Sequence, residues 1–262
     1  MLLVDSHAHI DARVYSKDLD QVIARAEEVG VRFIINAGFD LVSSRASLKL
    51  AQQYAGVFVA LGFHPHNAAS MRDGDLDILA QLSQEPKVVA IGEIGLDFYR
   101  NLSPKETQIE AFKRQLELAE TLGLPVIIHS RNADEEVFAI LAEWAGRQKN
   151  QHPGVLHCFG GDRELAERYI ALGFFLSLAG PVTYPSSNTA QIVSDIPLNR
   201  LLIETDCPFL TPLPYRGKRN EPAYLPLVAE KIGQIRGLAP EEVAGNTAQN
   251  AVQLFRLPVQ AR

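Results

Sequence analysis

The chain has 262 residues, of which 47% are hydrophobic and 21% are charged, and its formal net charge at pH 7 is −6. These values are close to the globular average, so they exclude intrinsic disorder and allow a sizeable core. The negative charge argues against a protein that coats nucleic acid non-specifically, because such binding rests on attraction to phosphates. It leaves room for an enzyme with one local phosphate site.

The cysteines and the first residues bear on where the protein works. Cys158 and Cys207 are too few for a disulfide framework, and reduced thiols are typical of a cytoplasmic protein. The first segment lacks basic residues, and Asp5 interrupts its apolar run, so we expect neither a signal peptide nor a membrane-spanning stretch. We therefore expect a cytoplasmic protein that does not bind membranes.

Short apolar runs recur along the chain. They are rich in Val, Ile, Leu and Phe, and continuous runs of this length are typical of strands covered on both faces, as in a parallel sheet. The runs span residues 2–5, 32–38, 57–64, 88–93, 124–130, 154–159, 173–180 and 200–206.

Helical patterns lie between several of these runs. Residues 18–30 carry apolar side chains at helical spacings and end in a glycine, and residues 162–173 repeat the plan. Residues 103–123 open with Ser103 as the expected N-cap, followed by proline, and close on a glycine. The stretch 239–255 predicts one or two further helical turns packed on the outside.

Eight strands that alternate with helices predict a (β/α)8 (TIM) barrel, and we expect residues 1–262 to form it as a single domain. An open, doubly wound sheet is the alternative. No G-x-G-x-x-G motif follows the first strand, which weakens a dinucleotide-binding version of that alternative. In a barrel, the carboxyl ends of all strands meet at one face, where active sites are built.

Histidine and acidic side chains are expected at that face. A purely structural explanation would have to place all of them at strand ends by coincidence, so the joint pattern favours metal ligands. The residues are His7, His9, His64, Glu93, His129, His157 and Asp206. By contrast, His66 and His152 lie in predicted loops, and we interpret them as structural.

The spacing of His7 and His9 has a physical meaning. Side chains alternate along a strand, so residues i and i+2 point to the same side and can grip one ion. Glu93 has two oxygens and can bridge two ions, while Asp206 can complete a metal site or hold the attacking water. Glu204, two residues before Asp206, is a candidate partner for a ligand histidine. Two ions about 3.5–4 Å apart support hydrolysis.

A basic loop follows the last predicted strand. It contains Arg216, Lys218 and Arg219, and loops in this position of such barrels often bind phosphate. On its own, a solvated basic turn would be the simpler interpretation, but the neighbouring hydrolytic site favours phosphate binding. Arg100 and Arg131 are expected to leave the same face.

Six segments together resemble the TatD family of metal-dependent deoxyribonucleases, within the amidohydrolase superfamily. They read LVDSHAHID, GEIGLDFYR, PVIIHSRNADEE, HCFGG, LLIETDCPFL and YRGKRNEPAYLP, and the match runs from residue 2 to the C-terminus. The resemblance implies a (β/α)8 barrel with two divalent ions, which could be Mg, Mn, Zn or Co.

The resemblance also implies roles for single residues. His7, His9, Glu93 and Asp206 would hold one ion, Glu93, His129 and His157 would hold the other, and His64 would lie near the substrate. Asp206 and Glu93 are the expected catalytic residues. The implied activity is 3′-to-5′ exonuclease cleavage of DNA, at 3′ ends or single strands.

Three functions stay open at this point. The first is a nuclease acting on DNA. The second is a metal-dependent amide or ester hydrolase, such as a deacylase, acting on a small or tRNA-linked substrate. The third is a binding protein that keeps the metal for structure, against which the full ligand set, Asp206 and the basic loop argue. We expect no obligate protein partner.

Overall fold

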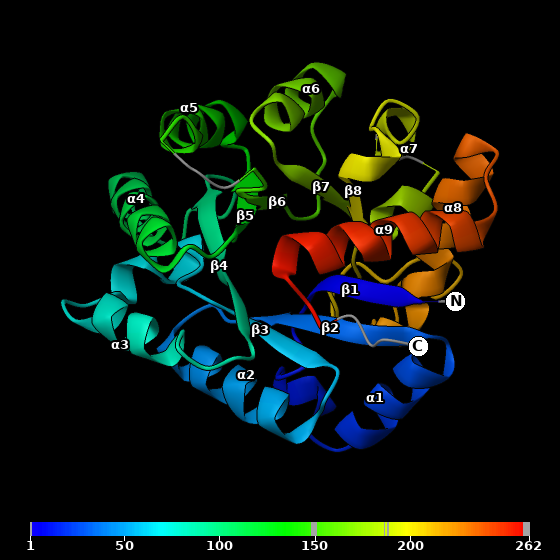
Figure 1. The fold of residues 1–262 in the computed structure, drawn as a ribbon, viewed down its shortest axis with the longest axis horizontal. Coiled ribbons are helices and arrows are strands. Elements are labelled where there is room, and N and C mark those ends of the chain that lie inside the picture. Colours follow the sequence, from blue (N-terminus) through cyan, green and yellow to red (C-terminus); the bar gives the residue numbers. More distant parts are fainter. Residues whose placement is uncertain (1, 148–150, 186, 188, 259–262) are drawn as a thin grey trace. The chain divides into compact units, whose positions relative to one another are not determined.

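The structure is a computed structural model that describes residues 2–147, 151–185, 187 and 189–258. Within these residues, strands and helices alternate regularly along the chain (Figure 1). Eight strands form one sheet in the order β1-β2-β3-β4-β5-β6-β7-β8. Parallel strands in sequential order, separated by helices, are the topology of the (β/α)8 barrel, so the predicted fold class is confirmed.

Each predicted apolar run overlaps one strand. The strands span Leu3–Ala8 (β1), Val31–Ala37 (β2), Val57–Leu61 (β3), Val88–Asp97 (β4), Val126–Arg131 (β5), Gly154–Leu156 (β6), Phe175–Leu178 (β7) and Leu201–Ile203 (β8). Their side chains are almost all buried, which explains why the runs are continuously apolar rather than alternating.

The helices lie between and after the strands. They span Leu19–Glu28 (α1), Leu41–Gln53 (α2), Asp75–Leu82 (α3), Lys105–Leu122 (α4), Asp134–Ala145 (α5), Arg163–Ala171 (α6), Thr189–Ile192 (α7), Leu225–Arg236 (α8) and Pro240–Phe255 (α9). None of the helices in the described part of the chain combines the length and apolar character that a membrane span requires.

The chain divides into two compact units. The first unit comprises Met1–Asn36, His157–Ile170 and Phe175–Arg262, and the second comprises Ala37–Leu156 and Ala171–Phe174. The expectation of a single domain over residues 1–262 stays a prediction.

In the first unit, β1 pairs in parallel with β2 and β7 pairs in parallel with β8. Helix α9 runs alongside β1 and also contacts β8 (Figure 1). Its apolar face, which includes Val243, Ala251 and Leu254, is buried. The expectation of one or two outer turns was therefore wrong, because α9 is a 16-residue helix whose small and apolar residues pack against the strands.

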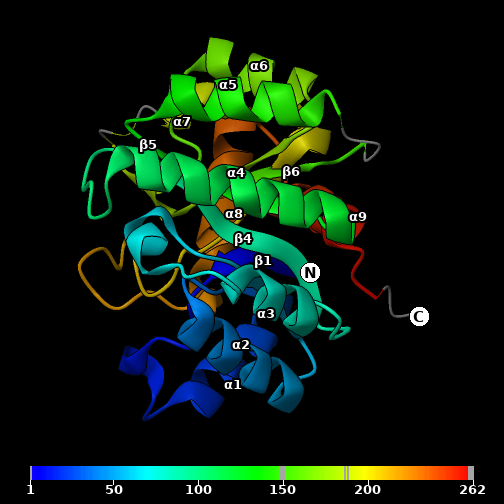
Figure 2. The same cartoon turned by 90° about the vertical axis from the view of Figure 1, so that its left-hand side faces the viewer.

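In the second unit, strands β3 to β6 pair in parallel in chain order. Helix α4 lies over β4 (Figure 2) and buries Phe112 and Leu116. It ends at Gly123 with φ 65°, as the sequence predicted. The N-cap prediction was wrong. Pro104 precedes the first helical residue, and Ser103 Oγ instead donates to the carbonyl of His66 at 2.9 Å.

Strand β4 is longer than expected, so Glu93 lies within the strand rather than at its end. The prediction that Glu93 ends the strand was wrong, since β4 continues to Asp97. Its pairing with β5 shifts register between Ile91 and Ile94, so the strand is irregular around Glu93. Beyond it, Gly95 has φ 141°, and a Cβ there would collide with the carbonyl oxygen of His129. Only glycine allows β4 and β5 to approach this closely.

Candidate active site

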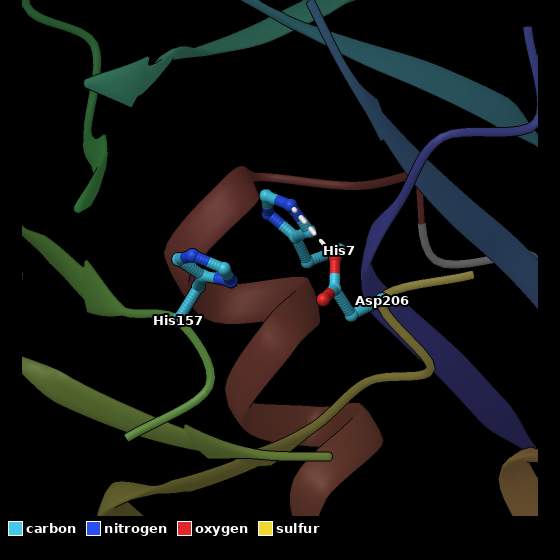
Figure 3. A group of neighbouring side chains, drawn as sticks. All are labelled: His7, His157 and Asp206. Atoms are coloured by element: carbon cyan, nitrogen blue, oxygen red, sulfur yellow. Dashed lines mark ion pairs between the residues drawn. The ribbon is translucent and has the colours of Figure 1, made fainter. Parts of the chain in front are cut away.

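Four predicted ligands of the first unit lie together. His7 lies in β1, His157 follows β6 and Asp206 follows β8 (Figure 3). His9 directly follows β1. The Nε2 atoms of His7 and His9 are 3.1 Å apart, so the two side chains point to the same side, as their i, i+2 spacing predicted. Asp206 Oδ1 lies 3.7 Å from Nε2 of His7 and 3.6 Å from Nε2 of His9. The rings of His7 and His157 are stacked at 4.2 Å.

Backbone hydrogen bonds hold the segments that carry these side chains. The Asp206 amide donates to the carbonyl of His7 at 3.0 Å, and the His9 amide donates to the carbonyl of Cys207 at 2.8 Å. These two bonds join the segment that follows β8 to β1 and to the residue directly after it. Asp206 itself has φ 52°, a left-handed conformation that is uncommon for residues other than glycine. The carboxylate is thereby fixed beside the two imidazoles.

The donor set of this group fits a divalent cation. His7, His157 and Asp206 each offer one ligand atom, and these atoms all lie within 4.8 Å of one another. The His7 side chain is fully buried, and only 13% of the Asp206 side chain is exposed. Imidazole nitrogen together with carboxylate oxygen is a ligand combination found with zinc, manganese and cobalt.

Glu204 lies behind His157. Its Oε1 accepts a hydrogen bond from the Cys158 amide at 2.7 Å and lies 3.4 Å from Nδ1 of His157. Burial acts to raise the pKa of Glu204, but the neighbouring His157 and His7 outweigh it and hold that pKa below its usual range. A charged carboxylate against a ring nitrogen is the arrangement that orients ligand histidines. The structure therefore places Glu204 where the sequence predicted a partner for a ligand.

A second group lies in the second unit. His64, Glu93 and His129 each offer a ligand atom within 4.8 Å of the others. Glu93 Oε1 is 2.8 Å from Nδ1 of His129 and 3.3 Å from Nε2 of His64. Burial lowers the pKa of His64 to about 4, so its ring is neutral at pH 7. Because His64 Nδ1 accepts the amide of His66, its Nε2 carries the proton and faces Glu93.

Sequence reasoning missed two members of this neighbourhood, Asp97 and His66. Asp97 Oδ2 lies 2.8 Å from Nε2 of His66 and 3.3 Å from Nε2 of His129. His66 had been interpreted as a structural loop residue. The available signal was that Asp97 stands four residues after Glu93 in one apolar segment, which puts both side chains on the same face of a strand.

The ionisation of Asp97 follows from its partners. Burial acts to raise its pKa, but hydrogen bonds from His129, the Arg100 amide and His66 outweigh burial. The pKa of Asp97 is held well below its usual range. Asp97 is thus ionised at neutral pH, and its carboxylate contacts the imidazoles of both His66 and His129.

One of the three cations in the basic loop already pairs with an acidic residue of the protein. Arg219 forms a bidentate ion pair with Asp18, at 2.8 and 2.6 Å, so a phosphate role would require this pair to open. Arg216 and Lys218 are exposed. The guanidinium carbon of Arg216 lies 4.3 Å from the ring centre of Tyr184.

Comparison with known proteins agrees with this arrangement. The family model described as TatD related DNase matches residues 4–256. The uncharacterized metal-dependent hydrolase YabD of Bacillus subtilis (strain 168) is 44% identical, over 98% of this chain and 100% of the relative. The 3′-5′ ssDNA/RNA exonuclease TatD of Erwinia billingiae (strain Eb661) is 36% identical, over 98% of this chain and 100% of the relative.

A solved structure is similar over the same length. The TatD homolog YJJV from Escherichia coli K12 superposes with a TM-score of 0.91 at 33% identity, covering 98% of both chains. Both the sequence and the fold therefore match along nearly the whole chain, and the resemblance drawn from the six segments is confirmed. The chain belongs to the TatD-related DNase family of metal-dependent hydrolases.

Proposed function

We propose that the chain is a nuclease that hydrolyses DNA from its 3′ end in the cytoplasm, with single strands as its preferred form. The observation that carries the proposal is the similarity, over nearly the whole chain, to a protein named a 3′-5′ ssDNA/RNA exonuclease. The grouped imidazoles and carboxylates support it, because metal-dependent phosphodiester hydrolysis uses such ligands.

We propose two divalent ions, which could be Mg, Mn, Zn or Co. In the first unit the donors would be His7, His9, His157 and Asp206, and in the second unit Glu93 and His129. The family resemblance shares Glu93 between both ions and gives His157 to the second, and this division stays a prediction. Divalent ions, when bound, neutralise phosphate charge and lower the pKa of water.

Asp206 is the proposed acceptor of the proton of the attacking water. Its carboxylate is nearly buried and is held beside His7 and His9, so it is fixed before substrate arrives. The water oxygen forms a bond to phosphorus, the bond from phosphorus to the 3′ oxygen breaks, and the water proton goes to Asp206. The released 3′ oxygen takes a proton from solvent.

Other residues position the substrate and the ligands. Glu93 holds His129 and His64 from one carboxylate oxygen, and Glu204 holds His157. The proposed substrate contacts are His64, whose neutral ring lies beside Glu93, and the exposed Arg216 and Lys218, whose charges suit phosphates. Arg219 would contribute only if it left Asp18.

The test uses a single-stranded oligonucleotide labelled at its 5′ end, with RNA and duplex DNA as parallel substrates. The metal-loaded protein should shorten the labelled strand stepwise from its 3′ end, and a chelator should stop the reaction. His129→Ala should abolish cleavage. His152→Ala is the matched control, because it removes an imidazole that belongs to neither ligand group.

Two results would contradict the proposed DNA exonuclease activity. Absence of cleavage with Mg, Mn, Zn and Co, together with hydrolysis of an acylated compound that is lost in His129→Ala, would assign the same groups to an amide or ester hydrolase. Cleavage of RNA in preference to DNA would correct the substrate and leave the reaction as proposed.

A further inference from the structure

We propose that Tyr99 and Arg131 form a stacking subsite that holds one unpaired base of a single-stranded nucleic acid. This subsite lies in the second unit, next to the His64–Glu93–His129 group. The proposal rests on the nuclease function proposed above, and it adds where part of the strand lies.

Tyr99 has an aromatic ring that is exposed to solvent although a guanidinium stacks on it. The residue is 61% exposed, although the guanidinium of Arg131 lies 4.0 Å from its ring centre. A guanidinium at this distance covers one face of the ring. The remaining exposed area therefore belongs to the other face and the edge of the ring, where a flat ligand can stack.

The pair is anchored on two adjacent strands. Tyr99 stands two residues after Asp97, and Arg131 is the last residue of β5, two residues after His129. Asp97 and Arg131 are register partners, and the Phe98 amide donates to the carbonyl of Arg131 at 2.9 Å. Tyr99 lies in the turn that follows β4, and two residues of chain span at most about 7 Å between Cα atoms, so the stack lies within one nucleotide's reach of the Asp97–His129 contact.

The surroundings carry positive charge. Arg100 and Lys105 are exposed in the same segment, and the Lys105 ammonium lies 4.3 Å from the ring centre of Phe98. With Arg131, which lies over the Tyr99 ring, three exposed cations belong to the two segments that form the subsite, on a chain whose net charge is −6. Aromatic faces interleaved with Arg and Lys are the recognition chemistry of single-stranded nucleic acids, because the cations meet phosphates while the ring meets a base.

The geometry specifies an unpaired base. Within a duplex, both faces of a base are covered by its neighbours, so only a splayed or terminal base can lie on the Tyr99 ring. Stacking accepts any of the bases, because each has a π-face. The subsite therefore predicts tolerance of sequence together with preference for single strands.

The experiment measures binding and cleavage of oligonucleotides in which a single abasic residue is moved along the strand from the 3′ end. For the wild-type chain, one abasic position should weaken binding by about 5- to 150-fold, the loss expected when one base–aromatic stack is removed. In Tyr99→Ala the penalty at that position should vanish, and all oligonucleotides should bind equally weakly. A merely structural role of Tyr99 would weaken binding without erasing the difference between base and abasic residue.

Two control variants sharpen the result. Tyr99→Phe retains the ring and should retain the position-specific penalty, while Leu102→Ala removes a side chain of similar exposure, 64%, from the same segment and should behave as the wild type. Equal abasic penalties in the wild type and Tyr99→Ala would overturn the stacking subsite while cleavage stands. A wild-type chain that neither binds nor cuts nucleic acid would overturn the nuclease proposal and the subsite with it.

Discussion

Asp97 and His129 are joined by a contact of 3.3 Å between Oδ2 of Asp97 and Nε2 of His129. The other ring nitrogen of His129, Nδ1, lies 2.8 Å from Glu93. The ring is therefore held between two carboxylates, and Asp97 fixes its orientation from the side away from Glu93. His66 binds the same oxygen of Asp97 at 2.8 Å, which ties a loop residue to the site.

Asp97→Asn should lower the affinity of the chain for divalent metal by about 10- to 100-fold, as the loss of a carboxylate that orients a ligand histidine usually does. Competition with a chromophoric chelator measures this affinity. His66→Ala is the control, because it removes the other imidazole partner of Asp97 and leaves the His129 contact intact. Equal metal affinity in Asp97→Asn and the wild type would show that Asp97 does not position His129.

Gly95→Ala should destabilise the protein by on the order of 2–4 kcal/mol, because the new Cβ would collide with the carbonyl of His129 in a left-handed conformation. Gly245→Ala is the matched control. Gly245 lies in α9 with no heavy atom near the position of an added Cβ, so the same change should stabilise by about 0.5–1 kcal/mol. Thermal unfolding of the two variants gives the comparison, and similar effects would contradict the close approach of β4 and β5.

The sequence predicted the strands well because each buried strand overlaps a short apolar run, a signal that needs no tertiary information. It placed Glu93 wrongly, since the irregular pairing of β4 with β5 depends on the neighbouring strand and is invisible in a single segment. It missed His66 because this residue reaches Asp97 only through the folded loop after β3. The N-cap prediction for Ser103 failed for the same reason, since its hydroxyl donates a hydrogen bond to His66 in that loop and does not cap α4.

Asp206→Asn should retain the fold and lose turnover by about 10²- to 10⁴-fold, the usual contribution of a positioned proton acceptor. Single-turnover cleavage of the oligonucleotide measures the chemical step, and circular dichroism confirms folding. Asp195→Asn is the control, because this acid pairs at the surface with Arg163 at 3.8 Å and should retain full activity. An Asp206→Asn variant with normal turnover would exclude the role of Asp206 in proton transfer.

The pair of Asp18 and Arg219 should contribute stability that depends on pH. The hydrogen bond from Arg219 lowers the pKa of Asp18 in the folded protein. A carboxyl group whose pKa is lower in the folded than in the unfolded protein stabilises the fold at any pH above its unfolded pKa of about 4. This contribution is lost as the pH falls through the lower pKa of the folded protein. The melting temperature of Asp18→Asn should therefore lie below that of the wild type at pH 7 and converge with it in acid.

Arg219→Ala tests the same pair from the other side and should lower the melting temperature at pH 7 by a similar amount. The effect should be small, because both side chains are partly exposed to solvent and the attraction is screened. If the difference in melting temperature between variant and wild type grew as the pH falls, the predicted direction of the pH dependence would be wrong.

Nucleic-acid binding should depend only shallowly on salt. Each phosphate neutralised on a single strand contributes a slope of about −0.7 to the plot of log affinity against log salt concentration. Since Arg219 is held by Asp18, the basic loop offers Arg216 and Lys218, and the double variant Arg216→Ala/Lys218→Ala should reduce the slope by about 1.4. Arg163→Ala, which removes an exposed cation paired with Glu167, should leave the slope unchanged. A wild-type slope equivalent to about eight or more contacts would mean that cations elsewhere on the surface carry the strand, because this loop cannot supply them.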